Sequence, residues 1–147
     1  MRAVIKTELP ASADRVWSLT QRGDTLSYIA RGLVSFGGDG LPEAFTEGSA
    51  VDVRLWFFGV LPAWRHHLAI RSMDHQQREL LSNEQGGLVR VWNHLIRVEP
   101  LDAGRCRYTD DLEIKAGLFT PLVWLYAQLF YRYRQWRWRS WLRVAPE

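Results

Sequence analysis

The chain has 147 residues, 47% of them hydrophobic and 24% charged, a composition typical of one folded globular domain and not of a disordered or collagen-like chain. Cys106 is the single cysteine, which excludes an internal disulfide and the paired-cysteine motifs of metal and redox sites. The formal net charge of +3 is local, because five arginines follow Tyr131 while the residues before them are slightly acidic. Residues 2–8 alternate and include Glu8, so they do not resemble the apolar core of a secretory signal. We therefore expect residues 1–147 to form one cytoplasmic domain.

The first third of the chain predicts a strand followed by two short helices. Residues 2–9 alternate between apolar and polar side chains, which is typical of a strand. Ser12 offers an N-cap for a helix over residues 12–19. A second helix is expected over residues 23–33, and the Gly-rich segment 37–42 predicts a loop.

The region between residues 49 and 116 consists of five β-rich stretches separated by short turns that contain Gly, Pro or Asp. Short turns between successive strands produce an antiparallel meander. Together with the strand at the N-terminus, these stretches predict a sheet of six strands. The five strands are expected at 49–58, 63–73, 78–85, 88–99 and 105–116.

Residues 118–144 predict one long helix, with Pro121 in its first turn, where a missing N–H costs little. The 16 uncharged residues from Ala116 to Tyr131 are fewer than the roughly 20 that cross a bilayer, so we expect no transmembrane span. Helical spacing gathers six large apolar residues into one stripe, which we expect to face the sheet. The stripe consists of Leu118, Leu122, Leu125, Leu129, Tyr133 and Trp136.

The predicted order of elements is a helix-grip arrangement, an α+β fold. A six-stranded antiparallel sheet curves around a long C-terminal helix, and two short helices follow the first strand. A further resemblance is carried by Pro10, Val16-Trp17, Trp92-x-His94, Thr109-Asp110-x-x-Glu113, Gly117 and the Arg-rich end of the last helix. With these residues the chain resembles the SRPBCC superfamily, which includes START-like and polyketide cyclase/dehydrase-like domains, over essentially its whole length. The resemblance implies a cavity between sheet and helix that holds an apolar ligand, and only some members of the superfamily are enzymes.

The last predicted hairpin places one polar pair on an otherwise apolar inner face. If its turn lies at residues 100–104, Trp92 is opposite Leu112 and His94 is opposite Asp110. A neighbouring carboxylate favours the charged imidazole, so His94 would act as a general base or orient a ligand. The alternative is a structural polar contact in the wall of the core, because the pair has no accompanying nucleophile or metal motif.

His66 is the other histidine expected on the inner face of the sheet. The expected register places it about 26 Å along the sheet from His94, at 3.3 Å per residue, so we do not expect the two to share a metal. The glycines at 37–40 lack the strand-to-helix setting and the lysine of a nucleotide site. We therefore expect neither a metal nor a cofactor.

A second aromatic stripe is expected on the far face of the last helix, where Trp124, Tyr131 and Trp138 recur every seven residues beside several arginines. Three interpretations stay open: a homodimer contact, a less favoured membrane-surface patch, and scattered exposed rings covered by arginine stems. Nucleic-acid binding is not expected, because the rest of the chain is slightly acidic.

These patterns favour a module that binds a hydrophobic or aromatic small molecule between the sheet and the last helix. The first alternative is a polyketide cyclase/dehydratase-like enzyme, in which His94, held by Asp110, moves a proton. The second is a lipid or membrane-surface-associated carrier. The residues expected to wall the cavity are Val53, Leu55, Phe57, Trp64, Leu68, Trp92, His94, Tyr108, Asp110, Leu112, Leu125, Leu129 and Tyr133.

Overall fold

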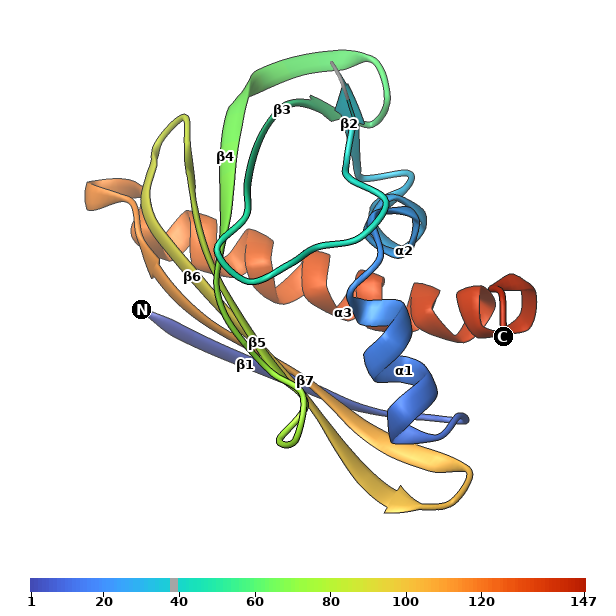
Figure 1. The fold of residues 1–147 in the computed structure, drawn as a ribbon. Coiled ribbons are helices and arrows are strands. Elements are labelled where there is room, and N and C mark those ends of the chain that lie inside the picture. The colour runs from blue at the N-terminus through green and yellow to red at the C-terminus, as the bar shows by residue number, and fades with distance from the viewer. Residues whose placement is uncertain (38–39) are drawn as a thin grey trace.

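The computed structural model describes residues 1–37 and 40–147, which form one curled sheet, two short helices and a long C-terminal helix (Figure 1). Part of the predicted loop, Gly38-Asp39, lies outside the described residues. The helical elements are α1 (Ala13–Thr20), α2 (Gly23–Ala30), the short 3-10 helix η1 (Gly117–Phe119) and α3 (Thr120–Val144). The strands are β1 (Arg2–Leu9), β2 (Val34–Gly37), β3 (Ala50–Phe57), β4 (Leu61–Asp74), β5 (Glu79–Gly86), β6 (Val89–Asp102) and β7 (Arg105–Lys115).

The sheet is antiparallel, and its order is β1-β7-β6-β5-β4-β3-β2. The helix-grip arrangement is confirmed, but the described residues form seven strands where the sequence predicted six. The additional strand is β2, an edge strand of only four residues that pairs with β3. It was missed because the helical pattern runs on to Leu33, whereas α2 ends at Ala30. A strand this short is too brief for its alternation to be recognised.

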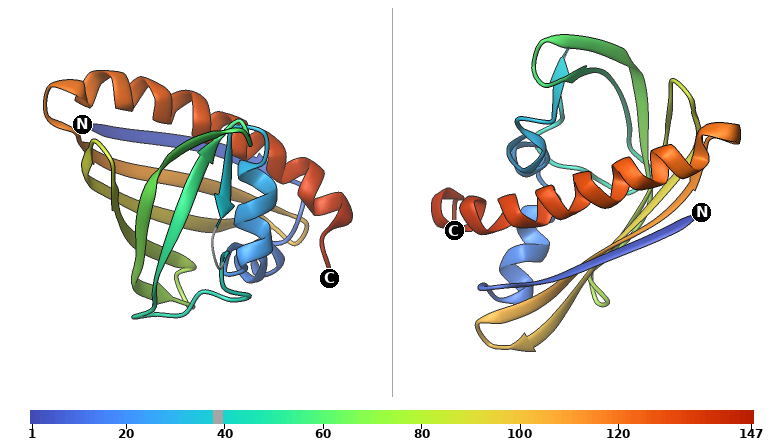
Figure 2. Two further views of the ribbon diagram at one scale, coloured as in Figure 1. Left: turned by 90° about the horizontal axis from the view of Figure 1, so that it is seen from above. Right: turned by 180° about the vertical axis from the view of Figure 1, so that it is seen from behind.

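The sheet bends because four of its strand pairs contain a register shift. These irregularities lie at Arg54/Trp56, Ile70/Ser72, Glu84/Gly86 and Pro100/Asp102. Bulges of this kind bend a strand and increase its twist. As a result the sheet curls, and α3 lies across its concave side (Figure 2).

The orientation of α3 is the largest correction to the sequence analysis. The leucine stripe was expected to face the sheet, but Leu118 is 98% exposed, Leu129 64% and Trp136 60%. The face that packs on the sheet lies around the helix from that stripe and includes two polar residues. It consists of Ala127, Phe130, Tyr131, Arg134, Gln135, Trp138, Trp141 and Leu142.

Polar contacts explain how a face with Gln135 can be buried. The Gln135 side-chain amide donates hydrogen bonds to the backbone carbonyl of Ile5 at 2.8 Å and to Asp110 at 2.9 Å. Buried polar groups with partners cost little, so the helix need not be apolar on its inner side. A prediction that assigns the most apolar stripe to the core therefore selects the wrong face.

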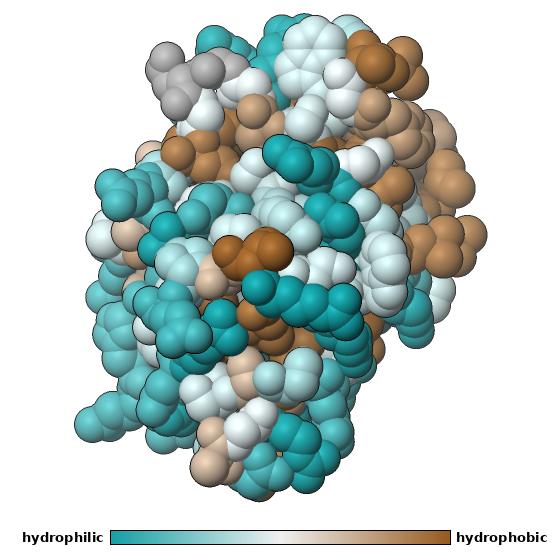
Figure 3. Space-filling view, turned by 90° about the vertical axis from the view of Figure 1, so that its right-hand side faces the viewer, coloured by the Kyte–Doolittle hydropathy of each residue, from teal (hydrophilic) through white to brown (hydrophobic). Residues whose placement is uncertain are grey.

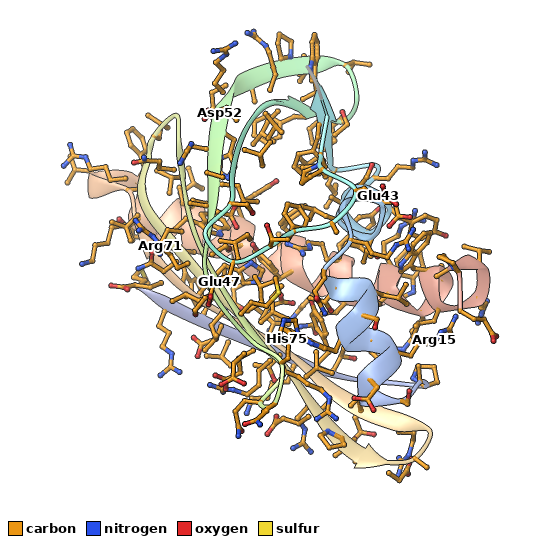
Figure 4. All side chains as sticks on the ribbon, viewed as in Figure 1. Arg15, Glu43, Glu47, Asp52, Arg71 and His75 are labelled. Carbon is orange, nitrogen blue, oxygen red and sulfur yellow. The ribbon has the colours of Figure 1, made fainter. Side chains whose placement is uncertain are left out.

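The helix ends are held by side chains. Ser12 caps α1 as predicted, accepting a hydrogen bond from the backbone N–H of Arg15 at 3.2 Å. The Arg15 guanidinium in turn donates to the backbone carbonyl of Leu142 at 3.2 Å, near the C-terminal end of α3 (Figure 4). A cation at a helix C-terminus satisfies free carbonyls and complements the helix dipole. The predicted position of Pro121 in the first turn of α3 is also confirmed.

The buried apolar residues form two clusters along the inside of the sheet. One contains α1, Trp138 and Trp141, and the other contains Trp92 and Tyr131. Cys106 belongs to the first cluster, and burial raises the pKa of its thiol to about 11. No helix in the described part of the chain is both long and apolar enough to span a bilayer.

Candidate functional site

A cavity of about 550 Å³ lies between the inner face of the sheet and helices α2 and α3. This volume is within the range of small-molecule sites, which is roughly 300–1,000 Å³. Four of the residues predicted to wall the cavity do not line it. Val53 and Leu112 are buried in the core, and Asp110 lies behind His94. The hydroxyl of Tyr133 donates a hydrogen bond to the carbonyl of Arg31 instead. The predicted residues that do line it are Leu55, Phe57, Trp64, Leu68, Trp92, His94, Tyr108, Leu125 and Leu129.

The mouth of the cavity is marked by residues that line it and are also more than half exposed. These are Leu88 in the β5–β6 turn and Leu122, Leu125 and Leu129 on α3. The leucine stripe predicted as core therefore borders the opening of the cavity. Exposed apolar side chains also gather along the upper right edge of the face drawn in Figure 3.

Aromatic rings form much of the wall near the mouth. Trp64 packs edge-on against Phe57, with ring centroids 5.5 Å apart. Gly86 and Gly87 make room for Trp64, because a Cβ at Gly87 would lie 2.5 Å from the Trp64 ring. Gly87 also has a φ of +55°, which glycine adopts at little cost. Deeper in the cavity, Trp92 donates a hydrogen bond to the hydroxyl of Tyr131 at 3.2 Å.

His94 and Asp110 are in contact, as the sequence predicted. The His94 Nε2 donates to Asp110 Oδ1 at 2.7 Å, and both side chains are almost fully buried. The predicted register of the hairpin is wrong by two residues, because His94 is opposite Leu112 and Asp110 is opposite Ile96. The strands continue to Asp102 and Arg105, so the turn is shorter than expected. The contact survives because diagonal neighbours on one face remain within reach of long side chains.

His66 lies close to His94, which corrects the expected separation of about 26 Å. Its Nε2 donates to Glu84 Oε2 at 2.8 Å, and Glu84 Oε1 lies 3.8 Å from His94 Nδ1. The hydroxyl of Ser82 donates to the same Oε1 at 3.0 Å. The expected separation was wrong because the register between β5 and β6 was predicted incorrectly. In the structure Ser82 is opposite His94. The described residues contain no group of three or more His, Cys, Asp or Glu side chains arranged to hold a metal ion.

The site therefore contains a buried polar chain, which we define as His66, Glu84, His94, Asp110 and Gln135. Burial alone would lower the pKa of His94, but its hydrogen bond to Asp110 and the nearby Glu84 carboxylate outweigh burial and raise the pKa above 6.5. Burial would raise the pKa of Glu84, yet contacts with both histidines hold that pKa well below its usual range. Both shifts favour the charged forms, so the two groups form an ion pair in the wall.

Three residues of the candidate site were not predicted from the sequence: Glu84, Arg134 and Gln135. Glu84 and Arg134 line the cavity, and Gln135 supports Asp110 from α3. Arg134 and Gln135 were missed because hydrophobic periodicity assigns the inner face of the helix to the leucine stripe, whereas the structure buries both residues. The spacing of Tyr131, Gln135 and Trp138 is also helical, and it could have signalled an alternative buried face.

The aromatic stripe predicted for a homodimer or membrane contact is mostly internal. Trp138 is fully buried and Tyr131 is 2% exposed, so neither ring is available to a partner. Trp124 is partly exposed, and its indole N–H donates to the backbone carbonyl of Arg2 at 2.9 Å. The expectation that these three rings share one exposed face is therefore wrong.

Comparison with solved structures agrees with the architecture described above. A START superfamily protein from Mycobacterium smegmatis is 15% identical, with a TM-score of 0.67 over 95% of this chain and 94% of that one. A protein from Chromobacterium violaceum is 13% identical, with a TM-score of 0.76 over 99% and 98%. Truncated norcoclaurine synthase from Thalictrum flavum is 19% identical, with a TM-score of 0.66 over 100% and 96%. The same synthase, solved in complex with dopamine and hydroxybenzaldehyde, is also similar at 18% identity, with a TM-score of 0.56 over 90% and 86%.

The curled sheet, the long C-terminal helix and these neighbours define an SRPBCC-type helix-grip fold. Within that class, the model of the family described as "Domain of unknown function (DUF8410)" matches residues 39–142, and the chain belongs to this family. No curated protein matches the chain.

Proposed function

We propose that the protein binds a hydrophobic or aromatic small molecule in the cavity between the sheet and α3. The observation that carries the proposal is the cavity itself, with about 550 Å³ of space behind a mouth lined by leucines. Apolar and aromatic walls supply affinity by removing ligand surface from water, at about 25 cal/mol per Å². The single thiol at Cys106 is free and buried, which supports a reducing cytoplasmic setting.

Two further features support an aromatic ligand. Trp64, Phe57 and Tyr126 form edge-on contacts beside the cavity, so flat ring faces and edges are available to a planar molecule. The structural neighbour norcoclaurine synthase was solved with dopamine and hydroxybenzaldehyde, which are both aromatic.

The test is a fluorescence titration with N-phenyl-1-naphthylamine, a neutral dye that brightens in apolar sites. Leu129→Trp should weaken binding by about tenfold or more, equivalent to about 1.4 kcal/mol, because the larger ring fills the mouth. Leu118→Trp is the matched control, since Leu118 is an exposed leucine in the adjoining helix η1 and does not line the cavity. Equal binding by all three proteins, with unchanged circular dichroism, would place the dye elsewhere.

A second candidate function is an enzyme that transfers a proton. The observation that favours it is His66, which lines the cavity and has a buried Nδ1 with no hydrogen-bond partner among the described residues. Because Nε2 donates to Glu84, Nδ1 is the nitrogen that carries the lone pair of a general base in the neutral imidazole. His94 was the sequence candidate, but its raised pKa favours a proton on both nitrogens, which suits an acid better than a base.

5-Nitrobenzisoxazole tests this second candidate. A base in an apolar pocket removes its C3 proton while the N–O bond breaks, which yields a coloured cyanophenolate. The reaction should exceed the rate in buffer and fall to that rate in His66→Gln. His67→Gln is the control. His67 follows His66 on β4 but points to the outer side of the sheet, where it pairs with Asp52 of β3. A rate equal to that of buffer, or one unchanged by His66→Gln, would reject the enzyme.

A further inference from the structure

Arg134 is a buried cation in the wall of the cavity, and no carboxylate of residues 1–37 or 40–147 pairs with it. Its side chain is 6% exposed and lines the cavity. The guanidinium carbon lies 4.7 Å from the centroid of the Tyr131 ring and 5.7 Å from that of Phe130, so the aromatic faces hold it in place. Its Nε has no hydrogen-bond partner among the described residues. None of the ion pairs that these residues form includes Arg134.

The two acids whose charges act on this cation, Asp110 and Glu84, already have other hydrogen-bond partners. Asp110 accepts hydrogen bonds from His94 at 2.7 Å and from Gln135 at 2.9 Å. Glu84 accepts from His66 at 2.8 Å and from Ser82 at 3.0 Å. Both carboxylates therefore have neutralising or hydrogen-bonding partners that are not Arg134.

The buried Nε–H of Arg134 has lost water without gaining an acceptor, which is costly even though the ring faces attract the charge. An acceptor supplied by a ligand would remove that cost. A carboxylate suits the position, because its two oxygens match the planar fork of an arginine. The rest of the cavity lining is mainly apolar, so it would cover the hydrocarbon or aromatic part of the same molecule.

We propose that the ligand is an amphipathic organic acid, whose apolar or aromatic body fills the cavity and whose carboxylate accepts hydrogen bonds from Arg134. This inference rests on the proposed binding function and adds the chemical class of the ligand. It also assigns Arg134 as the residue that determines specificity for an anion over a neutral analogue.

Calorimetric titration with 2-naphthoate and 2-naphthamide tests the inference, because the two probes share one ring system and differ in charge. Wild-type protein should bind the naphthoate more tightly than the amide by about tenfold to a hundredfold, the effect of a charge-assisted hydrogen bond. Arg134→Gln should remove that preference and leave binding of the amide within about twofold. Arg134→Lys should keep part of it, since it retains the charge but not the fork.

Arg132→Gln is the matched control, because it removes one positive charge from the same helix at an exposed position. It should leave both affinities unchanged. Amide binding without a preference for the acid, or a preference that persists in Arg134→Gln, would overturn the assignment of Arg134 and leave the cavity as a neutral site. Failure of wild type to bind either probe would overturn the binding function as well. The wild-type preference needs no variant, so it decides the question even if Arg134→Gln does not fold.

Discussion

Asp110 shows how the buried polar chain combines a strand, a neighbouring strand and a helix. It accepts a hydrogen bond from His94 on β6 through one oxygen and from Gln135 on α3 through the other. Asp110 therefore connects the sheet to α3, the helix that covers it. The sequence predicted the pair but not its third partner, because α3 was turned to the wrong face.

Asp110→Asn should lower the pKa of His94, because the neutral amide no longer favours the charged imidazole. The free energy of unfolding should fall by about 2–3 kcal/mol, the cost of weakening buried hydrogen bonds to a charged group. NMR titration of the His94 ring and urea unfolding measure the two effects. Asp102→Asn is the control and should change stability by less than about 0.5 kcal/mol, because its pair with Arg105 is largely exposed. A His94 pKa that stays the same or rises would contradict the pairing of a charged His94 with Asp110.

The shifts at Glu84 and His94 predict a defined pH dependence. The raised pKa of His94 contributes stability that is complete below 6.5 and is lost as the pH rises through the folded value. The lowered pKa of Glu84 contributes stability that is complete above 4.5 and is lost as the pH falls through its folded value. Both contributions are therefore complete between these two values. Urea unfolding from pH 6 to 9 should show a decline in wild type that is smaller in His94→Gln; parallel curves would rule out a role for His94.

At the scale of elements, α3 is the helix whose sequence is most misleading. Its most apolar stripe borders the cavity mouth, while its packed face contains Arg134, Gln135 and Trp138. A protein that keeps an open cavity must expose some apolar side chains around the entrance. Helical periodicity therefore locates the amphipathic faces of α3 but does not decide which one meets the sheet.

Trp138 and Trp136 test the orientation of α3 directly. Trp138 is fully buried and Trp136 is 60% exposed, although they are two positions apart. Trp138→Ala should reduce the free energy of unfolding by about 3–5 kcal/mol, because it leaves a cavity in the core. Trp136→Ala should cost less than about 0.5 kcal/mol, as is usual for surface changes. Urea or thermal unfolding compares them, and the reverse order would restore the orientation expected from the leucine stripe.

The strands were predicted more accurately than their registers. The five stretches from 49 to 116 correspond to β3 to β7, because turn residues separate them clearly. The link between Glu84 and His94 could not be predicted, since it depends on the β5–β6 register and on a shift at Glu84/Gly86. Bulges move the pairing by a residue and leave little trace in the sequence.

At the scale of the molecule, the curled sheet, α2 and α3 enclose one cavity that is mainly apolar and has a polar chain in its wall. The resemblance to the SRPBCC superfamily implied its location. The sequence also predicted nine of its lining residues, seven from alternation along the strands and two, Leu125 and Leu129, from the stripe on the last helix. It did not predict the cation at Arg134 or the link between the two histidines, which arise from tertiary packing. These groups distinguish the cavity from a plain hydrophobic core.

Uptake of a small apolar or aromatic molecule by this cavity is measured by a titration of ¹⁵N-labelled protein with 2-naphthamide, followed by two-dimensional amide NMR. We predict saturable shifts centred on cavity-lining residues such as Leu55, Ser82 and His94. The exposed positions Val4 and Glu113, on the outer side of β1 and β7, should remain unchanged. Shifts that do not saturate, or that centre on Val4 and Glu113 instead of the cavity wall, would contradict uptake by the cavity.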